Sequence, residues 1–90
     1  MFLISLVKLR RNPTKEDVAA MDKAMKEPSI QGLKIHSLHW TLGRYDLVIY
    51  SEAPNEKVAL AAAFQLGEAA STETLVAIPR EEALKTVGLR

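Results

Sequence analysis

The distribution of apolar residues along the chain predicts four short β-strands. Residues 2–9 are apolar at both alternating sets of positions, a pattern typical of a strand that is covered on both faces. Residues 33–42 and 45–50 are also rich in strand formers, and Gly43 between them predicts a tight hairpin turn. Residues 72–78 complete the set, so the sequence predicts a sheet of four strands.

A helix is predicted between the first two strands, where apolar residues recur at helical spacing. Thr14 with Asp17 three residues later resembles a capping box, in which each residue satisfies a free backbone N–H of the first turn. The alternative start is Asn12 as the cap with Pro13 at the first helical position. The helix is expected to stop by Pro28.

Two more helices are predicted in the second half of the chain. Asn55 is a plausible N-cap for an alanine-rich helix over residues 58–66, whose small side chains are expected to let it lie close to a sheet. Gly67 is expected to end it, and the alternative is an extension through Glu68-Ala69-Ala70. A short C-terminal helix starts at Pro79 and ends at Gly88.

The resulting order, βαββαβ plus a terminal helix, predicts a single α+β domain over residues 1–90 with a ferredoxin-like sandwich and an antiparallel four-stranded sheet. Right-handed crossovers place both long helices on one face of that sheet. The opposite face has no covering element, although both alternating sets of the first and third strands are apolar. Since soluble monomers rarely expose such a patch, we expect a homodimer, or a higher even oligomer, packed sheet against sheet.

Composition narrows the possible partners and cofactors. The 90 residues carry 12 Lys plus Arg against 11 Asp plus Glu, so bulk charge favours neither nucleic acid nor an anionic membrane as a partner. There is no cysteine, which removes disulfides, thiolate metal sites and cysteine nucleophiles. The apolar opening is too short to span a bilayer and its charges follow it, so we expect a cytoplasmic protein.

Three short motifs carry a resemblance to a known family. They are Trp40-Thr41-Leu42-Gly43-Arg44-Tyr45-Asp46-Leu47-Val48, then Glu52-Ala53-Pro54-Asn55, then Thr72-Glu73-Thr74-Leu75. Over about residues 39–83 the chain resembles the GYD domain family, named for the residues that here are Gly43, Tyr45 and Asp46. The family is similar to the dimeric α/β-barrel proteins, so the resemblance implies the same fold and a dimer, but it implies little chemistry.

The residues that could carry chemistry lie near the predicted hairpin and on the fourth strand. Asp46 is a candidate general base or partner of Arg44 at the mouth of a cavity, and its alternative role is to accept backbone hydrogen bonds at the turn. Tyr45 packs beside it with a polar tip outward. Glu73 is either a charge that protects an edge strand or a carboxylate inside the dimer cavity.

The two histidines and the larger aromatic residues complete the candidate site. His36 and His39 are three residues apart in a strand, so we expect them on opposite faces and predict no metal site. His39 remains a candidate acid or base. Trp40 is interpreted as a core or interface anchor, and Tyr50 could line the same cavity.

Two functions are consistent with these residues, and a third interpretation is a purely structural assembly partner whose cavity is filled by side chains. The first is a non-catalytic homo-oligomer that binds a small molecule in a cavity between two sheets, lined by His39, Trp40, Arg44, Tyr45, Asp46, Tyr50 and Glu73. The alternative is a small isomerase, decarboxylase or oxygenase without a cofactor, with His39, Tyr45, Asp46 and Glu73 as acid–base groups. The sequence has no glycine-rich phosphate loop, no Gly-x-Ser-x-Gly motif and no His-Glu-x-x-His motif, so we expect no cofactor.

Overall fold

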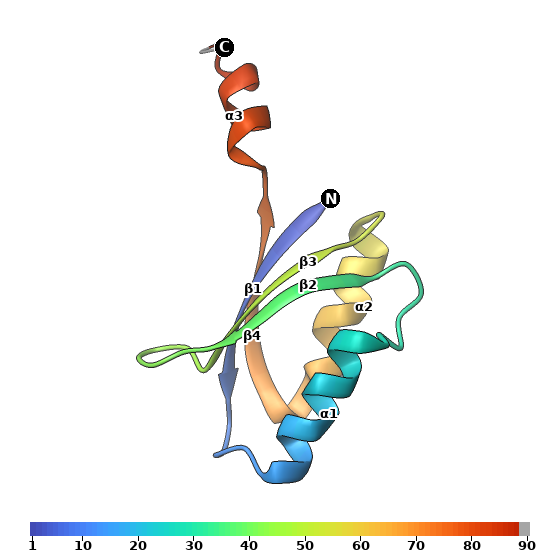
Figure 1. The fold of residues 1–90 in the computed structure, drawn as a ribbon, viewed down its shortest axis with the longest axis vertical. Coiled ribbons are helices and arrows are strands. Elements are labelled where there is room, and N and C mark those ends of the chain that lie inside the picture. Colours follow the sequence, from blue (N-terminus) through green and yellow to red (C-terminus); the bar gives the residue numbers. More distant parts are fainter. Residues whose placement is uncertain (89–90) are drawn as a thin grey trace.

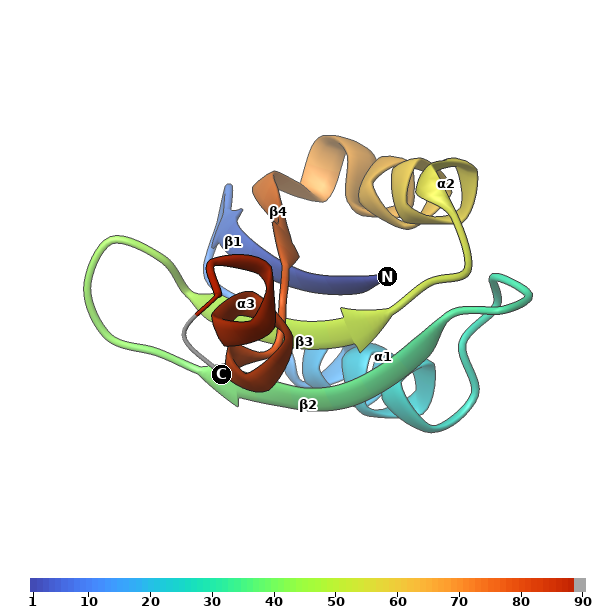
Figure 2. The same ribbon diagram turned by 90° about the horizontal axis from the view of Figure 1, so that it is seen from above.

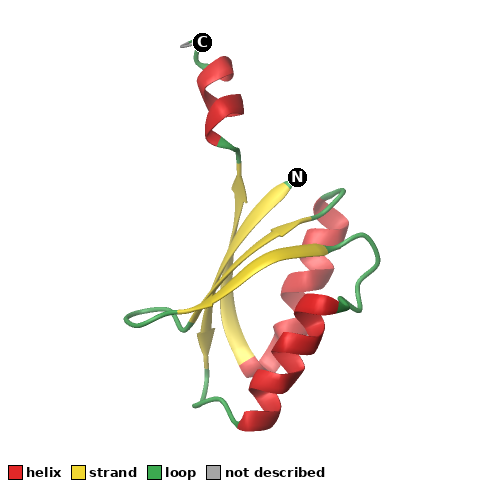
Figure 3. Cartoon of the chain, viewed as in Figure 1, coloured by secondary structure: helices red, strands yellow, loops and turns green. Residues whose placement is uncertain are grey.

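The structure is a computed structural model, which describes residues 1–88. Its elements are, in chain order, β1 (Phe2–Leu9), α1 (Lys15–Lys26), β2 (Lys34–Trp40), β3 (Leu47–Glu52), α2 (Glu56–Leu66), a 3₁₀ turn (Gly67–Ala69), β4 (Ala70–Ala77) and α3 (Arg80–Thr86) (Figure 1). The strands form one antiparallel sheet in the order β2-β3-β1-β4, drawn in yellow in Figure 3. This element order and sheet confirm the predicted α+β ferredoxin-like fold.

Both long helices lie on one side of the sheet. α1 contacts β2 and α2 contacts β4, so each helix covers one half of that side. Viewed from above, the two helices are well separated from each other (Figure 2). The short helix α3 projects past the end of the sheet, away from both of them (Figure 1). The opposite side of the sheet is therefore uncovered by α1 and α2.

The side chains of the sheet divide into two faces, which we call the helix side and the outer face. On β1, Leu3, Ser5 and Val7 point to the helix side, because Leu3 and Val7 are buried there. The alternate residues of β1, and the residues of β3 and β4 that pair with them, therefore lie on the outer face. Its larger apolar residues are Phe2, Ile4 and Leu6 on β1, Val48 and Tyr50 on β3, and Leu75 on β4.

The buried core lies on the helix side and is small. Val7 and Leu47 are 0% and 1% exposed, and Ala70 completes the cluster. Met21 and Leu66, from α1 and α2, pack partly buried against it. Neither helix contributes a fully buried residue, so the contact between the helix layer and the sheet is loose.

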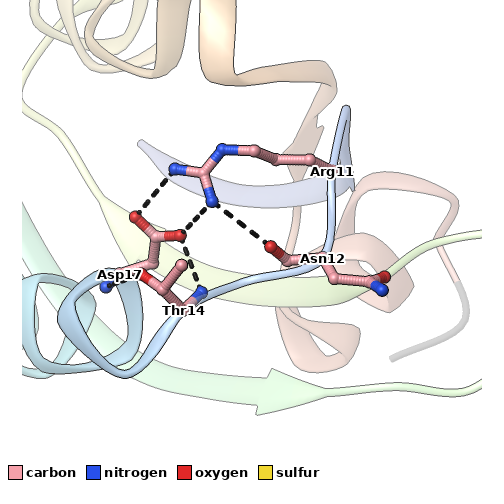
Figure 4. A network of polar contacts seen from close by, with 4 residues as sticks. All are labelled: Arg11, Asn12, Thr14 and Asp17. Atoms are coloured by element: carbon pink, nitrogen blue, oxygen red, sulfur yellow. Dashed lines mark hydrogen bonds and ion pairs between the residues drawn. The ribbon is translucent and has the colours of Figure 1, made fainter.

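The predicted capping box at the start of α1 is confirmed. Thr14 accepts a hydrogen bond from the Asp17 backbone N–H, and Asp17 accepts one from the Thr14 N–H (Figure 4). Arg11 adds an ion pair, with its Nη1 atom 2.9 Å from Asp17 Oδ2. The Thr14 backbone N–H lowers the pKa of Asp17, and the Arg11 hydrogen bond lowers it further.

The other helix ends also agree with the sequence. Asn55 caps α2 by accepting from the Val58 N–H at 3.0 Å, and Gly67 follows its last residue with a φ of 43°. α3 starts after Pro79 as predicted. The fourth strand begins two residues earlier than the pattern indicated, at Ala70, because the 3₁₀ turn after α2 is short.

Candidate functional site

The hairpin between β2 and β3 is longer than the sequence indicated. The prediction of a tight two-residue turn at Gly43-Arg44 is wrong, because Trp40 pairs with Leu47 and six residues connect them. The Thr41 N–H donates to Asp46 O at 2.8 Å, and Thr41 Oγ1 donates to Tyr45 O at 2.7 Å. These two bonds close the loop around Gly43, whose φ is 101°.

Asp46 holds this hairpin against β1. Its Oδ2 atom accepts a hydrogen bond from the Leu9 N–H at 2.8 Å, and its own N–H donates to Val7 O at 2.8 Å. The ion pair that it forms is with Lys8, whose Nζ lies 3.7 Å from the carboxylate, and the suggested pairing with Arg44 is not formed. Asp46 therefore has the backbone-accepting role that the sequence left open beside the catalytic one.

Tyr45 joins the hairpin to the edge strand β4. Its hydroxyl donates to Glu73 Oε1 at 3.1 Å, across 28 residues of sequence. The Arg44 guanidinium lies over the Tyr45 ring, 5.5 Å from the ring centroid. Arg44, Tyr45 and Glu73 thus form a chain of contacts at one end of the outer face. Glu73 lies on an edge strand, as its predicted role as a charge that protects such a strand requires.

The two histidines lie on the same face, contrary to the prediction. The register between β2 and β3 shifts between Ile35, which pairs with Ser51, and Ser37, which pairs with Tyr50. This β-bulge inserts His36 as an extra residue, which resets the alternation of side chains along β2. His39 pairs with Val48 of the outer face, and His36 packs against Tyr50 on that face as well.

His36 belongs to an aromatic cluster at the other end of the outer face. The rings of Phe2 and Tyr50 are stacked with centroids 5.8 Å apart, and the His36 ring lies 5.5 Å from that of Tyr50. His36 Nε2 is 3.0 Å from Glu52 Oε1. The sequence analysis missed His36 and Glu52 as partners, because the two residues are brought together only by the pairing of β2 with β3.

Trp40 does not join this cluster. It pairs with Leu47, whose side chain is buried on the helix side, so Trp40 and Tyr50 lie on opposite faces of the sheet. The prediction that they line one cavity is therefore wrong, and the same bulge explains the error. Trp40 is 43% exposed at the end of β2.

A cavity of about 160 Å³ lies on the helix side, between the sheet and the two long helices. Its walls are mostly apolar, with Leu3, Leu47 and Ile49 from the sheet and alanines from α1 and α2. The alanines were expected to bring α2 close to the sheet, but they leave this space instead. None of the seven candidate site residues lines the cavity.

The polar groups of the cavity are hydroxyls and one amide, which the sequence analysis did not single out. They belong to Ser5, Ser51, Gln65, Thr72 and Thr74. Ser5 Oγ and Thr74 Oγ1 lie 3.4 Å apart, and Gln65 donates to Ser29 in the loop after α1. A serine or threonine at a helix-side position of an apolar strand was the available signal.

Metal-binding and membrane-spanning features can be assessed for residues 1–88. Among the side chains that the structure describes, no three His, Asp or Glu residues are grouped closely enough to hold a metal ion. The described helices are also too short or too polar to cross a bilayer.

Comparison with known proteins gives a family. The GYD domain family matches residues 4–87, which extends the resemblance seen at residues 39–83 over nearly the whole chain. No curated protein and no solved structure matches the sequence. The chain therefore belongs to the GYD domain family.

Proposed function

We propose that this protein is a non-catalytic module that self-associates through the outer face of its sheet and carries a small molecule. The observation that supports self-association is the outer face itself. Six apolar side chains form its centre, on three adjacent strands, and neither long helix covers them. Burial of such a face against a second copy stabilises the association by about 25 cal/mol for each Å² of apolar surface removed from water.

The paired polar groups of the outer face lie at the two ends of its apolar centre. The His36–Glu52 pair is at one end of the apolar centre, and the Tyr45–Glu73 and Lys8–Asp46 pairs are at the other. An apolar centre with a polar rim is the usual anatomy of a protein interface. Tyr50, stacked on Phe2, is the kind of aromatic anchor that dominates binding energy in such interfaces.

The arrangement of the candidate acid–base groups supports binding without catalysis. An enzyme needs two titratable side chains that converge on one pocket. Here Asp46 is engaged by the Leu9 N–H and Lys8, and Glu73 is engaged by Tyr45. The cavity on the helix side has no titratable residue among those described in its walls.

A cavity between two sheets belongs to this proposal, because a second copy is needed to enclose it. His39, Tyr45 and Glu73 are the polar residues that two facing sheets would bring toward such a space. These side chains would orient a bound molecule at the rim, while the apolar centre holds the two copies together.

Native mass spectrometry of the purified protein, beside its denatured mass, tests the proposal. We expect an even-numbered oligomer, with extra mass when a small molecule is retained. A monomer at micromolar concentration would contradict self-association. An oligomer that never carries a ligand, even after incubation with a metabolite extract, would contradict the binding function and leave a purely structural assembly.

A further inference from the structure

The cavity between the helices and the sheet has a physical origin in the side chains of α2. This helix directs Ala59, Ala62 and Ala63 toward the sheet, whereas two of its large residues, Leu60 and Phe64, are 54% and 71% exposed. These inward alanines are short, α2 packs against the core through Leu66 near its end, and α1 does not close the gap because the two helices are separated. The space is thus built into the sequence of the helix.

Ser51 is an unusual residue in this cavity. It lies in the central strand β3, between Leu3 of β1 and Ile35 of β2, and is 5% exposed. It lines the cavity, and its hydroxyl makes no hydrogen bond with any other residue in the described part of the chain. The hydroxyl is therefore free to pair with a hydrogen-bonding group of a molecule held in the cavity.

We propose that this cavity binds a small neutral molecule, about the size of one aromatic ring, that carries a single hydroxyl or carbonyl group. The size follows from the volume, because an engineered cavity of about 150 Å³ in another protein binds benzene, and this one measures about 160 Å³. The ring lies against Leu47 and Ile49, and its polar group bonds to Ser51.

The chemistry of the walls sets the charge of the ligand. The described residues around the cavity are apolar, hydroxyl-bearing or amide-bearing, and none can neutralise a charge. Transfer of an unpaired carboxylate or ammonium group into such a space is strongly unfavourable. A neutral ring is therefore accepted and its charged analogue of similar size is excluded.

This site goes beyond the proposed function, because it lies on the opposite face of the sheet and is complete within one copy. Self-association through Ile4 and Leu6 is not required for it. The two proposals can therefore fail separately, and a monomeric protein that binds a ring compound would support this one alone.

The first experiment is a titration of the wild-type protein with phenol, followed by NMR of the isoleucine δ1-methyl groups. Ile35 and Ile49 line the cavity, and Ile4 lies on the outer face. We expect saturable shifts at Ile35 and Ile49, with dissociation in roughly the millimolar range that so small a ligand permits. Benzoate, the charged control, should cause no saturable shift.

Three variants make the assignment specific. Ala62→Leu fills the cavity and is expected to abolish phenol binding, whereas Ala61→Leu, the same change at the exposed neighbouring position, should leave it unchanged. Ser51→Ala removes the hydrogen bond, so phenol affinity should fall about tenfold while toluene affinity stays the same. Circular dichroism of each variant checks that it is folded.

The wild-type titration decides the proposal even if a variant does not fold. Saturable shifts at Ile4 but not at Ile35 and Ile49 would overturn it, as would equal binding of benzoate and phenol. Unchanged phenol binding in folded Ala62→Leu would overturn it as well.

Discussion

The two faces of the sheet have similar apolar composition and different surroundings. On the helix side, Leu3, Val7 and Leu47 are buried under α1 and α2, with a cavity beside them. On the outer face, Ile4, Leu6 and their neighbours are only partly buried, by each other. Burial on the helix side therefore stabilises the single chain. The outer face leaves apolar surface exposed, and a second copy can bury it.

The polar residues of the two faces differ in the same way. The polar side chains that pair with one another on the outer face are charged or ring-bearing and lie at the ends of the apolar centre. Those of the helix side are neutral, and Ser51 lies in the middle of the sheet. This difference is the basis of the two proposals, which place a second copy on one face and a small neutral molecule on the other.

The largest effect is expected from Leu47→Ala, which removes a side chain that is 1% exposed. The lost packing should lower the free energy of unfolding by about 3 kcal/mol. Urea denaturation at fixed protein concentration measures it. Leu42→Ala, at a fully exposed position of the hairpin loop, is the control and should change stability by less than about 0.5 kcal/mol. Equal effects of the two variants would show that the helix side is not the core.

Leu6→Lys tests the outer face, because it places a charge in the centre of the proposed interface. Association should weaken at least a hundredfold, or about 2.8 kcal/mol. Sedimentation analysis over a concentration series measures the change.

The control for this variant is Leu60→Lys, which places the same charge on the exposed side of α2. It should leave the oligomer intact. If Leu60→Lys dissociates the oligomer and Leu6→Lys does not, the copies associate through α2 and the assignment of the outer face is wrong.

Ala62→Leu sharpens the description of the helix side. A leucine at this position fills part of the cavity and should raise the free energy of unfolding by about 1 kcal/mol. Ala61→Leu carries the same change in helix propensity and points away from the cavity, so thermal denaturation of the pair isolates the packing effect. A lower melting temperature for Ala62→Leu than for Ala61→Leu would mean that the cavity has no room for the added side chain.

The smallest effect concerns the capping box of α1. The pKa of Asp17 is lowered in the folded chain, so its carboxylate stabilises the fold above its ordinary value of 3.8, and this contribution is lost as the pH falls toward the lowered pKa. Asp17→Asn should lower the free energy of unfolding at neutral pH. In this variant the free energy of unfolding should also fall less steeply than in the wild type as the pH drops below about 4. Asp22→Asn, within the same helix, serves as the control. Identical pH profiles of Asp17→Asn and the wild type would contradict this role.

The fold was predictable from the sequence because its signals are local. Thr14, Asn55 and Gly67 mark helix ends through their own side chains or backbone freedom, and each does so in the structure. The runs of apolar residues between these helix ends predicted the strands. These signals act over a few residues and need no knowledge of tertiary contacts.

The candidate site was predictable only in part, because it depends on register. One extra residue in β2 brought His39 to the outer face beside His36 and moved Trp40 to the helix side, and nothing in the local sequence marks a bulge. The cavity was missed for a different reason. Alanines on α2 permit either close packing or a gap, and only the position of α1 and the sheet decides which forms.

The most direct test of the different roles of the two faces uses the five isoleucine δ1-methyl groups of the wild-type protein. A dilution series without ligand should shift Ile4, as copies separate at the outer face, and leave Ile35 and Ile49 unchanged. Phenol at constant protein concentration should do the reverse. If Ile4 and Ile49 respond together to both treatments, the faces do not act separately and the account is contradicted.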